Sequence, residues 1–214
     1  MNINLGLYDI FSNIVPGFIY LLALYELSKS AKLQIPLSQM PEGISLAVVI
    51  TLTAYLLGQL LNTVSYHYWY RRFESYTKSR KRVLDTLKYE FPGLKIRFHP
   101  DDADMLMTII QHNNFDLSET IERLRANGIM MRNLSLGFAL LAFASVVNLI
   151  QNWFEYQYLI FILGWVICSA LSLRKAIDFS RWFYRDIFRQ ALQYGSTLEE
   201  ALKKSRTLTD RKKD

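Results

Sequence analysis

Residues 43–70 read GISLAVVITLTAYLLGQLLNTVSYHYWY, and this stretch contains no Asp, Glu, Lys or Arg. Its core, Ile44–Val64, has about the twenty residues that a helix needs to cross roughly 30 Å of hydrocarbon. Because a bilayer offers no water to backbone polar groups, a helix that satisfies them internally is the expected form. The stretch therefore predicts a transmembrane helix.

Three further runs share this composition. Ile10–Tyr25 is uncharged, and Asn133–Phe154 and Tyr156–Leu173 are separated only by Glu155, which predicts a tight helical hairpin. The runs could instead be core helices of a soluble protein, but such helices rarely stay uncharged beyond about 18 residues. The predicted fold class is therefore all-α: a polytopic membrane protein with four transmembrane helices and a helical cytoplasmic region.

The basic residues predict the orientation. Of the 25 Lys and Arg residues, twelve lie between Trp69 and Arg132 and eleven follow Leu173, whereas only Lys29 and Lys32 lie in the loops between. Since cytoplasmic loops carry the excess of Lys and Arg, both termini and the middle segment are expected in the cytoplasm. The start of the chain lacks the features of a cleaved signal peptide, so the first span is expected to be retained. The net charge of +6 then reflects topology more than nucleic-acid binding.

The predicted spans divide the chain into four parts. They are 1–70 with the first two spans, 71–132 as a cytoplasmic helical segment, 133–173 as a transmembrane hairpin, and 174–214 as a cytoplasmic amphipathic helix and tail. The second span is expected to continue as a helix to Phe91, where Pro92-Gly93 breaks it.

The cytoplasmic segment is expected to hold two more helices. One begins after Pro100 with Met105, Leu106, Ile109 and Ile110 on one face, and the other covers 117–126 and opens with an Asp116–Glu119 capping box. Such a segment is too small for a large core, so copies of the chain are expected to supply the missing burial.

The sequence predicts no enzyme. It contains no glycine-rich phosphate loop, nucleophile elbow or zinc motif, and Cys168 is the single cysteine. The carboxylates of the His99–Asp104 stretch could be metal ligands, but a helix N-terminus explains them more simply. We therefore expect no catalytic residue, no metal and no cofactor.

Polar residues in the first two spans suggest transport. Thr51, Tyr55, Gln59, Asn62 and Tyr66 recur at three- and four-residue spacing, beside a row of small residues formed by Ala47, Thr51, Ala54 and Gly58. The stripe could line a water-filled path between subunits, or it could bond neighbouring helices in a sealed bundle. In the first span, Pro16-Gly17 predicts a kink. The candidate pore-lining residues are Asp9, Asn13, Gln59 and Asn62.

Basic residues after the spans are candidates for binding an anionic ligand. They are Arg71, Lys78, Arg82, Arg181, Arg185 and Arg189. The last three recur every four residues, about 5.4 Å apart along a helix, which is comparable with phosphate spacing in a nucleic acid strand. Anionic lipid headgroups could satisfy the same side chains.

Three segments carry a resemblance to a known group of proteins. They are DIFSNIVPGF at 9–18, Arg132-Asn133-Leu134 at the start of the third span, and ALQYG at 191–195. With the overall layout they resemble small membrane proteins of bacterial anti-phage defence operons, most closely the membrane partner of the Hailong system, with the Kiwa membrane subunit as a second candidate. The resemblance implies a homo-oligomeric ion channel in the bacterial inner membrane, gated by an oligonucleotide from a companion nucleotidyltransferase.

The expected function is therefore a channel or pore-forming effector, assembled from copies of the chain (for example a tetramer) and gated through its cytoplasmic helices by a nucleotide or oligonucleotide. The alternative is a non-conducting membrane anchor or sensor that recruits a soluble defence protein.

Overall fold

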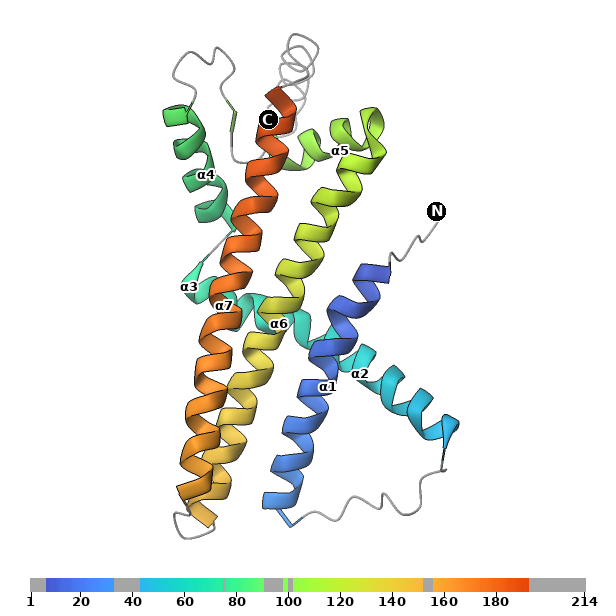
Figure 1. Ribbon diagram of the computed structural model, residues 1–214, viewed down its shortest axis with the longest axis vertical. Helices are drawn as coiled ribbons and strands as arrows, with labels where there is room; N and C mark the ends of the chain where they lie inside the picture. The colour runs from blue at the N-terminus through green and yellow to red at the C-terminus, as the bar shows by residue number, and fades with distance from the viewer. Residues whose placement is uncertain are drawn as a thin grey trace, which may run out of the picture. The chain divides into compact units, whose positions relative to one another are not determined.

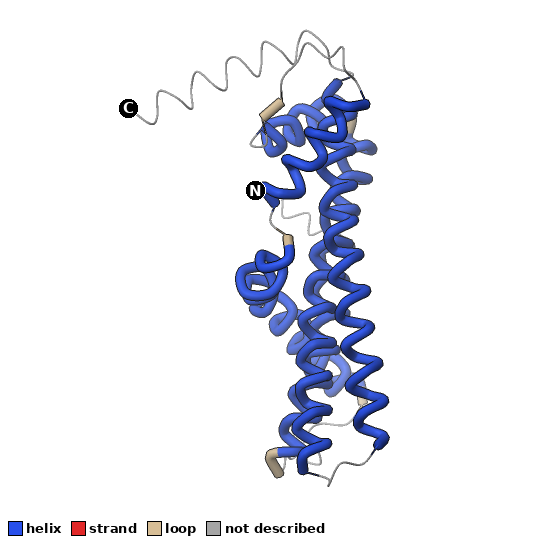
Figure 2. Tube along the Cα trace, turned by 90° about the vertical axis from the view of Figure 1, so that its left-hand side faces the viewer, coloured by secondary structure: helices blue, strands red, loops and turns tan. Residues whose placement is uncertain are grey.

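The computed structural model describes residues 7–32, 43–74, 76–90, 98–99, 102–151 and 156–192. Within these ranges nearly every residue is helical and no strand occurs, so the predicted all-α class is confirmed (Figure 2). Four helices in the described ranges are long and apolar enough to cross a membrane. They are α1 (Leu7–Ser30), α2 (Ile44–Val64) with its continuation to Phe73, α6 (Phe115–Gln151) and α7 (Tyr156–Ala191), as Figure 1 shows.

The third and fourth spans are longer helices than expected. The predicted helix at 117–126 and the predicted span from Asn133 belong to one continuous α6, which is described as far as Gln151, and α7 likewise continues through Arg174 without a break. A glycine inside a helix costs only about 1 kcal/mol, so Gly128 does not end α6. The capping box predicted at Asp116 is wrong, because the Asn114 side-chain oxygen accepts the hydrogen bond from the Leu117 N–H at 3.0 Å.

The second span continues differently from the expected uninterrupted helix. After α2 the chain forms a π-helical turn, η2 (Ser65–Tyr70), and then the short α3 (Arg71–Phe73). Glu74 is extended, with φ −145° and ψ 148°, and so ends the helix. A separate helix, α4 (Tyr76–Glu90), follows, and the predicted break at Pro92-Gly93 lies outside the described residues.

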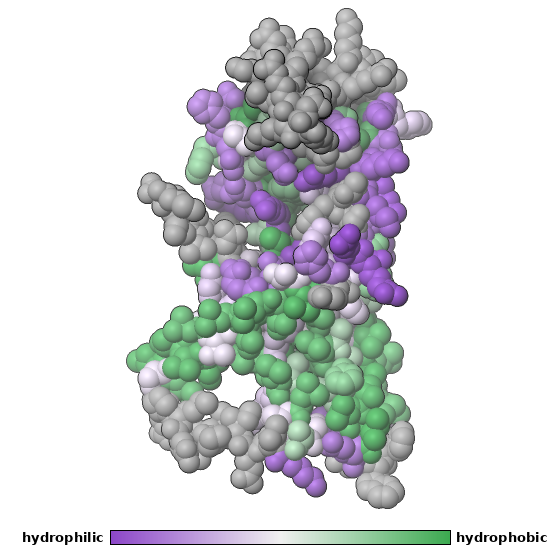
Figure 3. Space-filling model, turned by 180° about the vertical axis from the view of Figure 1, so that it is seen from behind, coloured by the Kyte–Doolittle hydropathy of each residue, from purple (hydrophilic) through white to green (hydrophobic). Residues whose placement is uncertain are grey.

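The chain divides into two compact units, and α6 and α7 contribute to both. Unit 1 consists of Met1–Glu74 and Ala126–Asp178, and unit 2 of Ser75–Arg125 and Phe179–Asp214. Unit 1 exposes many large apolar side chains, including Leu56, Leu60 and Phe161. Figure 3 shows hydrophobic side chains gathered on a broad surface, which is expected of a protein solvated by lipid tails.

In unit 1, α1 and α2 cross at their small residues. A Cβ atom added to Gly17 would lie 1.8 Å from the Ala54 carbonyl oxygen, and one added to Gly58 would lie 2.1 Å from that of Asn13. Ala54 and Gly58 are buried, so part of the predicted small-residue row does allow close packing, although Ala47 is exposed. The backbones of the two helices therefore touch.

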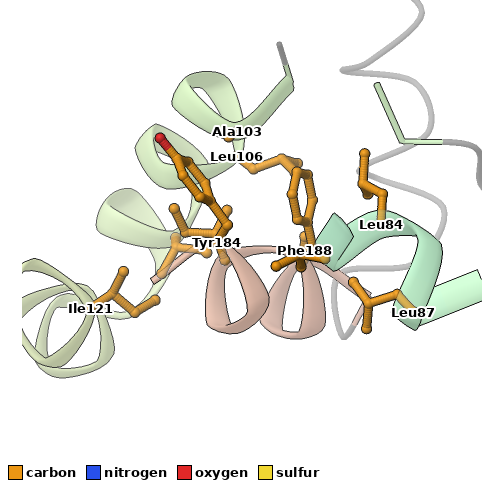
Figure 4. Packing of buried hydrophobic residues seen from close by; sticks show 11 residues of the cluster. Leu84, Leu87, Ala103, Leu106, Ile121, Tyr184 and Phe188 are labelled. Carbon is orange, nitrogen blue, oxygen red and sulfur yellow. The ribbon is translucent and has the colours of Figure 1, made fainter. Parts of the chain in front are cut away.

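Unit 2 has a hydrophobic core of its own. The face of α5 (Ala103–Asn113) predicted to be apolar is confirmed, since Leu106 and Ile110 are fully buried. The end of α7 supplies part of this core, where Ile187 and Phe188 pack with Leu84, Leu87, Ile121 and other residues of α4, α5 and α6 (Figure 4).

Candidate functional site

A buried arginine is the centre of the polar contacts in unit 1. Arg132 of α6 is 5% exposed, and its Nη2 donates a hydrogen bond to the side-chain oxygen of Asn62 on α2. The guanidinium carbon lies 5.2 Å from the centre of the Tyr66 ring and 5.8 Å from that of Tyr70. We call these four residues the Arg132 cradle. A buried charge is costly unless hydrogen bonds and aromatic faces surround it, and the cradle provides both.

The next residue of α6 joins the same region to α1. Asn133 is fully buried; the Tyr20 hydroxyl donates to its backbone oxygen at 2.7 Å, and the Ser65 hydroxyl bonds to its side-chain oxygen. Tyr20 belongs to α1 and Ser65 begins η2. Three segments that are distant in sequence are therefore held together at Asn133.

A second set of hydrogen bonds joins α6 to α7. The Ser135 hydroxyl lies 2.9 Å from the backbone oxygen of Ser169, and the Ser169 hydroxyl donates to the backbone oxygen of Ser135 at 2.8 Å. The Trp69 indole N–H of η2 donates to the Ser135 hydroxyl at 2.9 Å. Small hydroxyl-bearing residues allow such close backbone approach between membrane helices.

The π-helical turn explains how η2 supplies several of these contacts. In an α-helix, residues five apart point about 140° away from each other. A π turn bonds residue i to residue i+5 and is wider than an α turn, so Ser65 and Tyr70 lie closer to one face than they would in an α-helix. Ser65 and Tyr70 are indeed both buried. π turns inside α-helices are often found at functional sites.

The four predicted pore-lining residues do not share one surface. Asn13 is buried, with its amide nitrogen 3.4 Å from the Ser12 hydroxyl, and Asn62 belongs to the Arg132 cradle. Gln59 is exposed and donates to the Tyr55 hydroxyl at 3.3 Å. The side chain of Asp9 lies outside the described part of the chain. The predicted polar stripe of α2 therefore has an exposed part and an enclosed part.

The six predicted ligand-binding cations are divided between the two units. Arg71 is exposed on α3 of unit 1, and Lys78 and Arg82 are exposed on α4 of unit 2. The other three lie on α7 in unit 2: Arg181, Arg185 and Arg189.

Two of the α7 arginines already contact carboxylates of their own chain. Arg189 is 2.6 Å from Glu90 of α4, and Arg185 is 3.7 Å from its neighbour Asp186. The positive charge of this row of arginines is therefore partly neutralised. The row should bind phosphate groups more weakly than its spacing alone suggests.

The carboxylates near α5 have structural roles. Asp102 accepts a hydrogen bond from the backbone N–H of His99 at 2.7 Å, and Asp104 is 3.3 Å from Arg80. Among the described residues, no group of three or more His, Cys, Asp and Glu side chains could hold a metal ion.

Sequence reasoning missed the residues at the centre of the site. From the sequence, Arg132 was a cation that sets topology and part of a segment that carries the resemblance, but Arg132, Ser135 and Ser169 were not named as site residues. A usable signal was present: Arg132, Asn133 and Ser135 are closely spaced polar residues at the start of an apolar run that continues a helix.

Comparison with known proteins adds no assignment, because no protein-family model, curated protein or solved structure matches the chain.

Proposed function

We propose that the chain forms a homo-oligomeric membrane channel in which α2 lines the path of the ions. The observation that carries the proposal is the hydrogen bond between the exposed Gln59 and the half-buried Tyr55, within a span whose most apolar 18-residue stretch is only 11% buried within the chain. Polar side chains are costly in hydrocarbon unless they face a neighbour or water. A second copy of the chain would provide such a neighbour, and a water-filled path between copies would provide the water.

The distribution of residues around α2 supports this arrangement. With about 100° between successive residues, Ala54 and Gly58 face α1 while Tyr55 and Gln59 lie to one side of them. Val49, Leu60 and Val64 lie to the other side and are exposed. Lipid can cover the apolar side. The side with Tyr55 and Gln59 also carries the exposed Val48 and Leu52, so its repetition around an axis would line a path with polar groups beside apolar ones.

The Arg132 cradle supplies a route by which unit 2 could control α2. The start of α6, Phe115–Arg125, belongs to unit 2, and the same helix carries Arg132 in unit 1. Arg132 holds Asn62, which lies three residues beyond Gln59 on α2. A rotation or shift of α6 on ligand binding would therefore act on the polar flank directly.

The ligand and setting of the channel are proposed from the sequence. Exposed cations of unit 2 such as Lys78 and Arg82 suit an anionic ligand, for which nucleotides are the proposed class. The bias of Lys and Arg supports a cytoplasmic position for unit 2. A role in anti-phage defence is supported only by the resemblance of short segments.

Conductance of the purified full chain in planar bilayers tests the proposal, with nucleotides and short oligonucleotides added on each side. Gln59→Leu should abolish the ligand-dependent current. Thr53→Val is the matched control: Thr53 is also exposed on α2, but its hydroxyl bonds to the Val49 backbone oxygen of its own helix at 2.7 Å. Equal loss in both variants, or current unaffected by Gln59→Leu, would remove α2 from the path.

A non-conducting anchor that recruits a soluble protein through residues 71–132 is the second candidate. It is favoured by two exposed aromatic side chains on unit 2, Tyr89 at 89% and Phe115 at 71% exposure. Replacing both by serine should then abolish recruitment of the partner to membranes. A wild-type protein that never conducts but still recruits would support this candidate over the channel.

A further inference from the structure

Exposed cations lie where two spans of unit 1 end. Arg71 and Arg72 are exposed on α3, directly after the buried Tyr70. Arg174 and Lys175 are exposed on α7, directly after the buried Leu173. We call these four residues the basic belt.

Hydrogen bonds place the two halves of the basic belt at the same end of unit 1. Trp69, two residues before Arg71, donates to Ser135 at 2.9 Å, and Ser135 in turn lies 2.9 Å from the backbone oxygen of Ser169 on α7. Arg174 is five residues beyond Ser169, or about 7.5 Å further along the helix. The two pairs of cations therefore lie near one level of the bundle.

Exposed apolar side chains adjoin the basic belt. Phe73, in contact with Trp69 at 5.5 Å between ring centres, is 52% exposed, and Leu171 is 59% exposed. A surface that changes from apolar to cationic within one helical turn matches the boundary between acyl chains and headgroups. Within the described ranges, Arg71, Arg72 and Arg174 form no ion pair, so an anion from outside the chain can pair with them.

We propose that the basic belt binds the phosphate groups of anionic phospholipids. A headgroup offers its phosphate at the level of the guanidinium groups, while its acyl chains cover Phe73 and Leu171. A soluble polyanion could pair with the cations but would leave those apolar side chains uncovered. Arg71, which the sequence leaves as a candidate for an anionic ligand or for lipid headgroups, is thereby assigned to lipid. The inference is independent of whether the protein conducts ions.

Native mass spectrometry of the full chain in mild detergent tests this assignment, with phosphatidylglycerol and phosphatidylcholine in competition. The test variant replaces Arg71, Arg72 and Arg174 by glutamine. The matched control replaces three exposed cations of unit 2 that are not ligand candidates, Lys81, Lys88 and Arg125, by glutamine. Both variants lose the same charge from exposed helical positions.

Each cation near an anionic surface strengthens binding roughly fivefold, so the test variant should lower the preference for phosphatidylglycerol by on the order of a hundredfold at low salt. The control should change it less than about threefold. A variant with lysine at the three belt positions should keep the preference for phosphatidylglycerol, because a lysine ammonium group also pairs with a lipid phosphate. The lysine variant also separates loss of charge from misfolding.

Two results would overturn the assignment. One is an unchanged lipid preference in the glutamine variant together with normal folding. The other is loss of binding to a short oligonucleotide, measured in neutral lipid nanodiscs, in the belt variant but not in the unit 2 control. That result would mean that the basic belt binds a soluble polyanion.

Discussion

The close crossing of α1 and α2 allows us to predict how four Gly→Ala substitutions change the free energy of unfolding. Ordinary contacts of a Cβ atom begin near 3.4 Å, so Gly58→Ala requires a displacement of about 1.3 Å from the Asn13 oxygen and Gly17→Ala about 1.6 Å from that of Ala54. Both obstacles are backbone atoms, which cannot rotate away. In Gly137→Ala the nearest atom, at 2.8 Å, is a methyl group of the Ile19 side chain. Gly164 has nothing within 4 Å.

The expected order of stability follows from these distances. Inserting a methyl group into a well-packed region costs about 1–3 kcal/mol, so Gly17→Ala and Gly58→Ala should each cost about 3 kcal/mol or more. Gly137→Ala should cost about 1 kcal/mol, because the Ile19 side chain can shift. Gly164→Ala should be neutral or stabilising by up to about 1 kcal/mol, since it removes backbone freedom from the unfolded chain at no steric cost.

Thermal unfolding of the purified full chain in one detergent, followed by circular dichroism, measures the series. For a chain of this length, 1 kcal/mol corresponds to roughly 2–4 °C in Tm, so Gly58→Ala should lower Tm by about 6–12 °C. Gly164→Ala is the matched control, since it makes the same chemical change in a transmembrane helix. A Tm for Gly58→Ala within about 2 °C of the wild type, or the largest loss at Gly164, would refute the close crossing.

Three further predictions concern the Arg132 cradle and unit 2. Arg132→Gln combined with Asn62→Leu in a double-mutant cycle should show a coupling free energy of about 1.5–3 kcal/mol, as for a hydrogen bond to a charged group, and additive effects would contradict the contact. Ile110→Ala should cost about 2–5 kcal/mol in unfolding free energy, because it leaves a cavity in the core of unit 2. Arg189→Gln should cost at most about 1 kcal/mol, because its pair with Glu90 is partly exposed, and a larger loss would mean that the pair holds α7 on unit 2.

Much of the secondary structure followed from local pattern. The uncharged length of 43–70 predicted the second span. The spacing of Leu106 and Ile110 predicted the buried face of α5, because in a short helix with polar residues around it the apolar stripe is the face that packs on other elements. The helix boundaries were less predictable. Asn114 and Asp116 are both good caps, and only the backbone geometry shows that Asn114 accepts the hydrogen bond.

The candidate site was only partly accessible from the sequence. Gln59 and Tyr55 were identified on the polar stripe, and both are on an accessible part of α2. Asn13 and Asn62 belonged to similar patterns, yet Asn13 lies against α2 and Asn62 against Arg132. Spacing places residues on a face of a helix, but it does not say whether that face meets water, lipid or another helix.

The sequence by itself determined the four apolar spans, the separation of charged from uncharged blocks and the small residues that allow α1 and α2 to approach, since each is a property of neighbouring residues. Only the tertiary structure decided that Arg132 is buried, that Asn133 joins Tyr20 to Ser65, and that the end of α7 completes the core of unit 2. Those contacts join residues up to 113 positions apart. Their free energies depend on which helices pack together, which no local periodicity encodes.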